Sequence, residues 1–513
     1  MKKIIFIILI SSVVSAQKLP TDFDLSNRLN KIEDATPLSN VIERVSIIGD
    51  TILVGTSKGL SVSFDKGESW KNFFNDEIFR DESVSAVGYD RGTIWAATWH
   101  FENVAGSDIA TGSGLRFSKD KGKSWTIIPQ PIDNPADSSI VYGINNIRAL
   151  PVTTEKQNFI RDITFYNNTV FIATNAGGIR KSNDEGKTWQ RVVLPPDYLD
   201  RIKQTDTLNF SLQPVAGAFG KEANLNHIGF SLLTASTGWI YAGTAGGINI
   251  SDDGGVSWVK LNHSNQEEPI SGNHILAIEE NPLDKSIWAA TWKAEGASEF
   301  WAVSQSPNGG ISWNNFLEGE RVLDFAFSKN SVFVASQDGL FQSDDKGTTW
   351  FSAPEISDND KKIILNTKNF RALDTYENSV NNILWIGTLS GLVKYEIGNS
   401  LWSGKWNILL SSGAAATSNT SFSFPNPFSP DSKKANIKYS IANDGDVTIR
   451  IFDFGMNLVK TVLQNAPRRS GIDLIDTWDG RDESGRIVSN GVYFYRIESG
   501  SGEPMYGKIL VVL

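Results

Sequence analysis

Six copies of one eight-residue motif place an aspartate or asparagine where it can hold a tight turn together. Each copy has Ser at its first position, Asp or Asn at the third, Gly at the fifth and Trp at the eighth. The copies are SFDKGESW ending at Trp70, SKDKGKSW at Trp125, SNDEGKTW at Trp189, SDDGGVSW at Trp258, SPNGGISW at Trp313 and SDDKGTTW at Trp350. A carboxylate at the third position can accept hydrogen bonds from the amides of its own turn, and the glycine supplies a positive φ. We therefore assign a structural role, and no catalytic one, to Asp65, Asp120, Asp184, Asp253, Asn308 and Asp345.

Aromatic side chains gather where two of the repeats are interrupted by insertions. IWAATWHFENVAGSDIATGSGL at 94–115 and IWAATWKAEGASEFWAVSQ at 287–305 replace the tight turn of the other units. Loops on a rigid scaffold often carry binding sites, and flat rings suit the apolar faces of sugars. The insertions therefore give a candidate platform for a carbohydrate or peptide: Trp99, His100, Phe101, Trp292 and Trp301. The alternative is that these rings pack the base of their own loops.

Four arginines lie near the starts of predicted strands and could line the mouth of a central channel: Arg148, Arg161, Arg321 and Arg371. His227 and His274 have similar positions. Such a cluster would suit a ligand with a carboxylate, such as a sialic or uronic acid, because guanidinium groups bind carboxylates as a fork. The other interpretation pairs the arginines with aspartates near them in sequence, namely Asp162, Asp324 and Asp374.

The sequence lacks the other familiar catalytic patterns. It has no cysteine, which excludes disulfides, thiolate catalysis and a cysteine-bound zinc. It has no G-x-S-x-G elbow, phosphate-binding loop or H-E-x-x-H pair, and its 4 histidines are scattered. We therefore predict no catalytic residue, no metal and no cofactor.

The turns belong to a larger unit of four strands. Each motif follows two β-rich runs, such as TILVGT at 51–56 and LSVSF, and a further strand precedes each pair. The further strands are predicted at 44–48, 84–89, 160–166, 228–234, 275–280, 322–328 and 370–376. Four strands make one propeller blade, so the sequence predicts an all-β, seven-bladed β-propeller. The motif would join the third and fourth strands at one face, and the insertions would lie at the other.

Residues 37–410 resemble the Asp-box, or BNR, repeats of sialidases, xyloglucan hydrolases, sortilin-type receptors and a photosystem II assembly factor. A seventh unit, ILWIGTLSGLVKYE at 383–396, lacks the box and is similar to a two-component-regulator propeller repeat. We expect the segment from Val41 to Thr56 to close the ring by pairing near the last blade, because a closed ring leaves few free sheet edges. The sialidase catalytic set does not transfer, because the nearest string to its Phe-Arg-Ile-Pro motif, NNIRALP at 145–151, has the wrong spacing.

Residues 1–16, MKKIIFIILISSVVSA, have the pattern of a secretory signal peptide. Lys2 and Lys3 precede an apolar run that is too short to span a membrane, and Val14-Ser15-Ala16 offers a cleavage site. Residues 17–36 are expected to form an N-terminal segment of the mature chain. Removal of two lysines changes the formal charge from −10 to −12, which disfavours nucleic acid as a partner. No later segment is predicted to cross a membrane.

After a small, polar linker at 411–421, residues 422–513 read as a sandwich of short strands. FPNPFSP, IKYSIANDGDVTIRIFDFGMNLV, WDGRDESGRIVSNGVYFYRI and KILVVL resemble the Ig-like domain of the flagellar hook-capping protein and the C-terminal sorting domains of type IX secretion cargo. The resemblance implies export through the periplasm and across an outer membrane by the type IX machinery.

The sequence thus predicts an exported, surface-attached or secreted propeller that binds a glycan or a surface protein without catalysis. A glycoside hydrolase of sialidase or xyloglucanase type is the alternative. We expect a monomer.

Overall fold

The computed structural model consists almost entirely of β-strands. It describes residues 33–34, 36–215, 223–360, 363–365, 367–377, 382–411, 421–430, 434–441, 444–468, 471–500 and 504–513. Within these ranges, the helical structure is a short 3-10 helix, η1 (Leu225–His227). The predicted signal peptide, most of the 17–36 segment and most of the 411–421 linker lie outside the described residues.

Seven sheets share one design, in which four strands pair in sequence order, and we number them ring sheets 1 to 7. Ring sheet 1 contains β2 (Ile42–Ile48), β3 (Thr51–Thr56), β4 (Gly59–Ser63) and β5 (Trp70–Phe73), and ring sheet 2 contains β6 (Ser83–Asp90), β7 (Thr93–Val104), β8 (Ser107–Ser118) and β9 (Thr126–Ile128). Ring sheet 3 contains β12 (Ile160–Tyr166), β13 (Thr169–Thr174), β14 (Gly178–Ser182) and β15 (Gln190–Arg191), and ring sheet 4 contains β18 (Gly229–Thr234), β19 (Ile240–Thr244), β20 (Gly247–Ser251) and β21 (Trp258–Leu261). Ring sheet 5 contains β22 (His274–Glu280), β23 (Ile287–Trp292), β24 (Ala302–Ser306) and β25 (Asn314–Phe316). Ring sheet 6 contains β26 (Val322–Ser328), β27 (Ser331–Ser336), β28 (Leu340–Ser343) and β29 (Phe351–Ser352). Ring sheet 7 contains β32 (Phe370–Glu377), β33 (Asn382–Thr388), β34 (Gly391–Glu396) and β35 (Lys405–Leu409). The predicted first strands coincide with the observed ones to within two residues.

Short strands accompany the ring sheets. β1 (Glu33–Asp34) precedes ring sheet 1, and β16 (Arg201–Ile202) pairs with the outer strand β21 of ring sheet 4. β30 (Ser357–Asp358) and β31 (Ile363–Ile364) form a small hairpin between ring sheets 6 and 7 in sequence.

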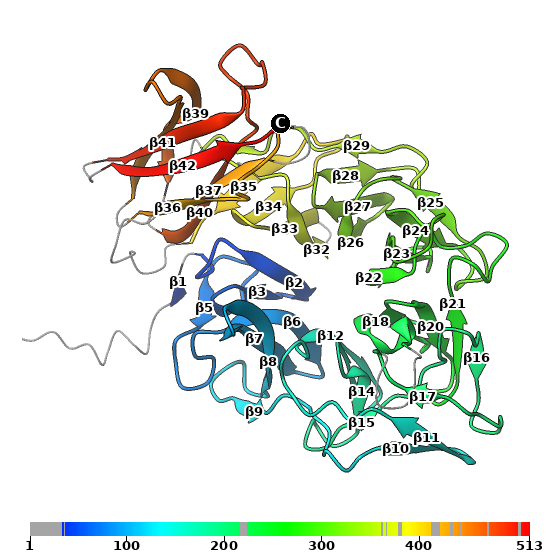
Figure 1. The fold of residues 1–513 in the computed structure, drawn as a ribbon. Coiled ribbons are helices and arrows are strands. Elements are labelled where there is room, and N and C mark those ends of the chain that lie inside the picture. The colour runs from blue at the N-terminus through cyan, green and yellow to red at the C-terminus, as the bar shows by residue number, and fades with distance from the viewer. Residues whose placement is uncertain are drawn as a thin grey trace, which may run out of the picture. The chain divides into compact units, whose positions relative to one another are not determined.

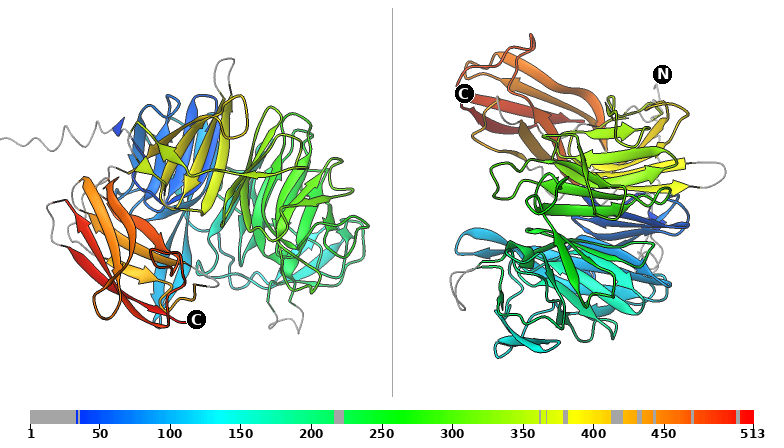
Figure 2. Two further views of the ribbon diagram at one scale, coloured as in Figure 1. Left: turned by 90° about the horizontal axis from the view of Figure 1, so that it is seen from above. Right: turned by 90° about the vertical axis from the view of Figure 1, so that its right-hand side faces the viewer.

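The first strand of every ring sheet lies at the centre of a closed ring (Figure 1). β2 contacts β6, and the contacts continue through β12, β18, β22 and β26 to β32, which returns to β2. Figure 2 shows the ring sheets standing side by side in edge-on views. This is the arrangement of a β-propeller. The segment Ile42–Thr56 does meet the last ring sheet, but as two strands of ring sheet 1 packed against β32, not as a strand added to that sheet.

Each first strand has a β-bulge at the same place. In ring sheet 3, Ile160 pairs with Thr174 and Asp162 pairs with Ala173, so Arg161 is left between them without a partner in the ladder. The same shift occurs in the other six ring sheets. The extra residues, called bulge residues below, are Glu43, Ser85, Arg161, Phe230, Leu276, Leu323 and Arg371.

The core of the ring lies in the seams between neighbouring ring sheets, and each seam holds an apolar cluster with a tryptophan. The six motif tryptophans are distributed one to a seam: Trp70, Trp125, Trp189, Trp258, Trp313 and Trp350. The remaining seam, between ring sheets 6 and 7, contains Trp406. Each motif indole N–H makes no hydrogen bond among the described residues, so these side chains stabilise the seams by packing.

The turn between the third and fourth strands is held by the same hydrogen bonds in all six motifs. In the first, Gly67 N donates to Ser63 Oγ at 2.7 Å, and Ser69 N donates to Asp65 Oδ1 at 2.9 Å. Asn308 accepts from Ser312 N at 3.0 Å through its amide oxygen. The other third-position residues accept in the same way: Asp120, Asp184, Asp253 and Asp345.

Long connections lie at the opposite end of the sheets from these turns. β7 and β8 extend into a hairpin that remains paired as far as Val104 and Ser107. The connection between β23 and β24 is a loop at 293–301. The connections before and after ring sheet 3, at 129–159 and 192–228, share a small sheet of β10 (Ser139–Tyr142), β11 (Asn145–Ala149) and β17 (Ser211–Leu212). Asp133 joins the 129–159 connection to the ring, because Oδ1 of the carboxylate pairs with Arg180 Nη1 at 2.7 Å.

The C-terminal residues form two further sheets around one apolar core. One sheet contains β36 (Ser421–Phe424), β37 (Ala435–Ile441) and β40 (Gly471–Trp478), and the other contains β38 (Gly445–Phe452), β39 (Leu458–Arg468), β41 (Gly491–Ser499) and β42 (Met505–Val511). Tyr439, Trp478 and Tyr495 are buried between the two sheets. This part of the chain is therefore a β-sandwich.

Candidate binding site at the mouth of the ring

The mouth of the ring is the end at which the first strands begin and the second strands end. Antiparallel pairing brings these strand ends together, so the seven bulge residues and the 94–115 and 287–305 insertions all belong to this end. The strands set the positions of these side chains, and the bulge frees one residue per sheet from the ladder.

Six side chains form a continuous row across ring sheets 2 to 5, which we call the mouth ladder: Phe101, Trp99, Phe159, Arg161, Phe230 and His274. The ring centroids of Phe101 and Trp99 are 4.9 Å apart, and those of Trp99 and Phe159 are 5.4 Å apart. The Arg161 guanidinium lies 5.0 Å from the ring centroid of Phe159 and 4.9 Å from that of Phe230. Phe230 meets His274 edge to face, at 5.6 Å. These distances are those of favourable aromatic and cation–π contacts.

The mouth ladder is accessible to a ligand. Phe101 is 63% exposed, and the other five side chains are half-buried. Rings that hold one another in place lose little conformational freedom when a ligand stacks on them. The row can therefore serve as a preformed apolar platform.

Arg161 is the charged centre of the mouth ladder and is held in one orientation. Its Nε donates to Asn175 Oδ1, and the two phenyl rings lie against its guanidinium. Its Nη1 and Nη2 make no hydrogen bond or ion pair with any described residue. Burial and the neighbouring Arg44 lower the pKa of Arg161 to about 10, which leaves it charged at neutral pH without a counter-charge.

The rest of the mouth is occupied by pairs within the protein. Arg371 Nη2 lies 2.9 Å from Glu43 Oε2, so these two bulge residues neutralise each other. Arg321 stacks on Trp301 at 4.9 Å. Trp292 donates its indole N–H to the Val322 carbonyl oxygen at 2.7 Å.

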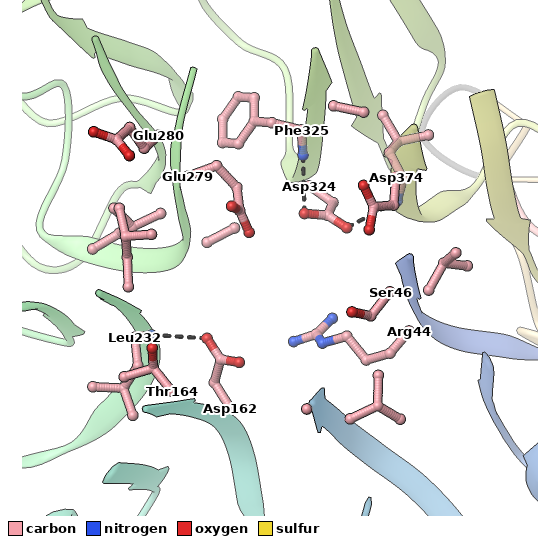
Figure 3. Close-up of a pocket in the computed structure, with 18 of the residues that line it drawn as sticks. Arg44, Ser46, Asp162, Thr164, Leu232, Glu279, Glu280, Asp324, Phe325 and Asp374 are labelled. Carbon is pink, nitrogen blue, oxygen red and sulfur yellow. Dashed lines mark hydrogen bonds between the residues drawn. The ribbon is translucent and has the colours of Figure 1, made fainter. Parts of the chain in front are cut away.

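A central channel of about 450 Å³ is lined by the first strands. Figure 3 shows the charged side chains that point into it: Arg44, Asp162, Glu279, Asp324 and Asp374. Three of the acids accept a backbone N–H from the first strand of the next ring sheet. These bonds join Asp162 Oδ2 to Leu232 N at 2.8 Å, Asp324 Oδ2 to Leu373 N at 2.9 Å and Asp374 Oδ2 to Ile47 N at 2.6 Å.

Confinement in the channel makes it costly to ionise these carboxyl groups. Burial raises the pKa of Asp374 to about 7 and that of Asp324 to about 6. Water reaches Glu279, yet the surrounding protein and the three aspartates raise its pKa well above the ordinary range. Arg44 is the cation among them, and its charge favours ionisation of Asp324 and Glu279.

The structure distributes the predicted site residues over several settings. Trp99, Phe101 and Arg161 come together in the mouth ladder, whereas Trp301 and Arg321 form a separate pair. His100 contacts Ser113 Oγ through Nδ1 at 3.0 Å. Arg148 lies in β11 of the 129–159 connection, with an exposed side chain.

Among the described residues, Arg161 and Arg371 do not pair with the aspartates near them in sequence. Arg161 contacts Phe159 and Phe230, while the next residue, Asp162, accepts a bond from the neighbouring ring sheet. Arg371 pairs with Glu43 in place of Asp374. His227 is buried, and burial lowers its pKa to about 3, so it is a neutral packing residue.

Three residues of the mouth have no distinguishing sequence signal. Phe159 and Phe230 lie at strand starts, where a phenylalanine is indistinguishable from a core residue. Glu299 is buried in the 293–301 loop and accepts hydrogen bonds from Ala294 N at 2.7 Å and Gly296 N at 3.0 Å. A carboxylate followed by Phe300 and Trp301 gives no pattern from which that role could be inferred.

No protein-family model matches the chain, and no curated protein matches its sequence. Among solved structures, the chain is similar to YCF48 bound to D1 peptide, with a TM-score of 0.43, 19% identity, and coverage of 72% of this chain and 96% of that one. It is also similar to PorZ, an essential surface component of the type IX secretion system of Porphyromonas gingivalis, with a TM-score of 0.33, 14% identity and coverage of 91% and 75%. A third is the extracellular domain of the putative hybrid two-component system BT3049 from B. thetaiotaomicron, with a TM-score of 0.32, 12% identity and coverage of 92% and 68%. All three TM-scores are below 0.5.

Within the described residues, no helical structure is long and apolar enough to cross a membrane. Nor do three or more His, Asp or Glu side chains of those residues gather in a way that could hold a metal ion.

Proposed function

We propose that residues 37–410 form a seven-bladed β-propeller of the Asp-box type that binds a glycan or protein ligand at its mouth without catalysis. The observation that carries this proposal is the mouth ladder. Its rings come from four successive ring sheets, so they form one surface across the ring and do more than pack the base of their own loops. Half-exposed rings next to an uncompensated cation are typical of recognition sites.

Binding to glycan and peptide arrays tests this function. We expect the intact protein to bind, and we expect Trp99→Ala combined with Phe230→Ala to abolish binding by removing rings on both sides of Arg161. The matched control is Trp239→Ala, which removes an exposed tryptophan from the turn between β18 and β19 at the other end of the ring. Unchanged binding by the double variant would refute the assignment of the mouth ladder. Release of sugar from sialylated or β-glucan polysaccharides would favour the glycoside hydrolase alternative.

We also propose that the protein is exported, with residues 1–16 as signal peptide and residues 422–513 as an Ig-like sorting domain for type IX secretion. The support is the sequence resemblance of the C-terminal residues, together with their own β-sandwich core. Deletion of 422–513 should trap the chain in the periplasm of a bacterium with this secretion system. Normal surface display of the truncated chain would refute the sorting role.

A further inference from the structure

We propose that the ligand of the mouth ladder is a carboxylate-bearing sugar, whose carboxylate binds the Nη edge of Arg161. This inference rests on the proposed binding function and adds to it the chemical class of the ligand. Arg161 is the only bulge residue of the described ring that is both cationic and without an acidic partner, because Arg371 pairs with Glu43.

The surroundings of Arg161 leave one direction open to an anion. Asn175 occupies its Nε, and Phe159 and Phe230 lie against the guanidinium, so the two Nη groups remain as donors. Two parallel N–H groups in a fixed plane match the two oxygens of a carboxylate. The geometry therefore favours an anion that can accept both hydrogen bonds at once.

Nearby acids do not provide that anion. Asp162 uses its carboxylate for Leu232 N and Ile163 N, at 2.8 and 2.9 Å. Glu299 uses its own for the amides of its loop. Arg44 is also close, since its Nη2 donates to the Arg161 carbonyl oxygen at 3.4 Å, and its charge is shared with the acids of the channel. Among the described residues, no acid occupies the Nη groups of Arg161.

The platform beside Arg161 suits a sugar better than a peptide. Trp99 and Phe101 present faces and edges on which the C–H groups of a pyranose ring can stack. A pyranose ring is held by stacking and one bidentate anion contact, whereas an extended peptide also needs backbone groups to pair with.

The test compares matched ligands on the full-length protein by calorimetry. One series is tri-galacturonic acid, its methyl ester and neutral galactotriose, and a second is sialyllactose with lactose. We expect at least one free acid to bind about ten- to a hundredfold more tightly than its ester or neutral counterpart, as for a charge-assisted bidentate contact. Arg161→Gln should abolish that preference, and Arg161→Lys should restore part of it.

The control variant is Arg91→Gln, which removes an exposed arginine from the turn between β6 and β7, away from the mouth, and should keep the preference. The comparison of acid with ester in the unaltered protein needs no variant to fold. Equal affinity for acid and neutral sugars would overturn this inference and leave the binding function intact. Binding of peptides through a free α-carboxylate, with no sugar bound, would also overturn it. Binding of no glycan or peptide would overturn the proposed function itself.

Discussion

Asp374 accepts the backbone N–H of Ile47 across the seam between ring sheets 7 and 1, at 2.6 Å. Burial raises the pKa of this carboxyl group from 3.8 to about 7, and the nearby Asp324 contributes to the increase. The folded state therefore binds a proton more tightly than the unfolded chain does. The contribution of the Asp374 carboxyl group to stability is complete below pH about 4 and is lost as the pH rises through 7.

We expect Asp374→Asn to reduce this loss, because the amide oxygen can still accept from Ile47 while the charge is absent. As the pH rises from 5 to 8, the free energy of unfolding of the variant should increase relative to that of the wild type by about 1–3 kcal/mol. Denaturant unfolding at both pH values measures the gain. Asp81→Asn, an exposed substitution outside the channel, serves as the control. A stability difference between Asp374→Asn and wild type that does not change with pH would contradict this role of the carboxyl group.

The motif turns carry a prediction about a single side chain. Asp65 accepts from Ser69 N, Ser69 Oγ and Ser63 Oγ, at 2.9, 2.5 and 2.7 Å. Asp65→Ala should lower the unfolding temperature by a few degrees, since the turn amide loses its acceptor. Asp65→Asn should have a smaller effect, because Asn308 holds the fifth turn with an amide. Thermal unfolding distinguishes them, and equal destabilisation by both would contradict the proposed role of the acceptor oxygen.

At the scale of an element, the 293–301 loop depends on one buried carboxylate. Glu299 accepts bonds from Ala294 N and Gly296 N within the loop and from Asn273 N outside it. Glu299→Ala should increase the rate of tryptic cleavage after Lys293 roughly tenfold or more, because several charge-assisted bonds are lost together. Glu295→Ala, an exposed change in the same loop, should leave the rate unaltered. Cleavage at the wild-type rate would show that other contacts fix the loop.

The strands of the ring were predictable because the four-strand unit repeats. Units with a clear motif show where the strands lie in a unit whose motif is absent. The strand at 160–166 matches its prediction at both ends. The bulges were not predictable, because an extra residue in a strand has no composition of its own. Nearness in sequence suggests that Arg161 and Asp162 pair, whereas in the structure Asp162 accepts from Leu232 N. The contact of Phe159 and Phe230 with Arg161 follows from the bulge and from the order of the sheets around the ring.

For the whole molecule, the seam between the first and last ring sheets is the place where the ring closes. Asn40 accepts from Gly391 N through its carbonyl oxygen at 2.7 Å, and from Ser411 N through its side chain at 2.6 Å. We expect Asn40→Ala to cost about 1–3 kcal/mol, because it removes the side-chain acceptor of the buried Ser411 amide, which follows β35. Hydrogen exchange should accelerate in β2 and β34 more than in β19.

The control for the seam is Asn168→Ala, which removes the acceptor of Arg91 in an exposed turn and should change stability little. If Asn40→Ala accelerated exchange uniformly around the ring, the seam would have no special role in stability. If exchange did not change at all, the side-chain bond of Asn40 to Ser411 N would not help to close it.

The seven bulge residues have a consequence for the diversity of such proteins. Each occupies an equivalent position in its ring sheet, so together they form a circle of seven side chains around one opening. None of them has a partner in the ladder, and substitutions there leave the strand pairing intact. Two pairs of neighbouring bulge residues already differ. Glu43 and Arg371 neutralise each other, whereas Arg161 stacks on Phe230. Substitutions at these seven positions could therefore change the ligand of the mouth while the seams, the motif turns and the strand order stay the same.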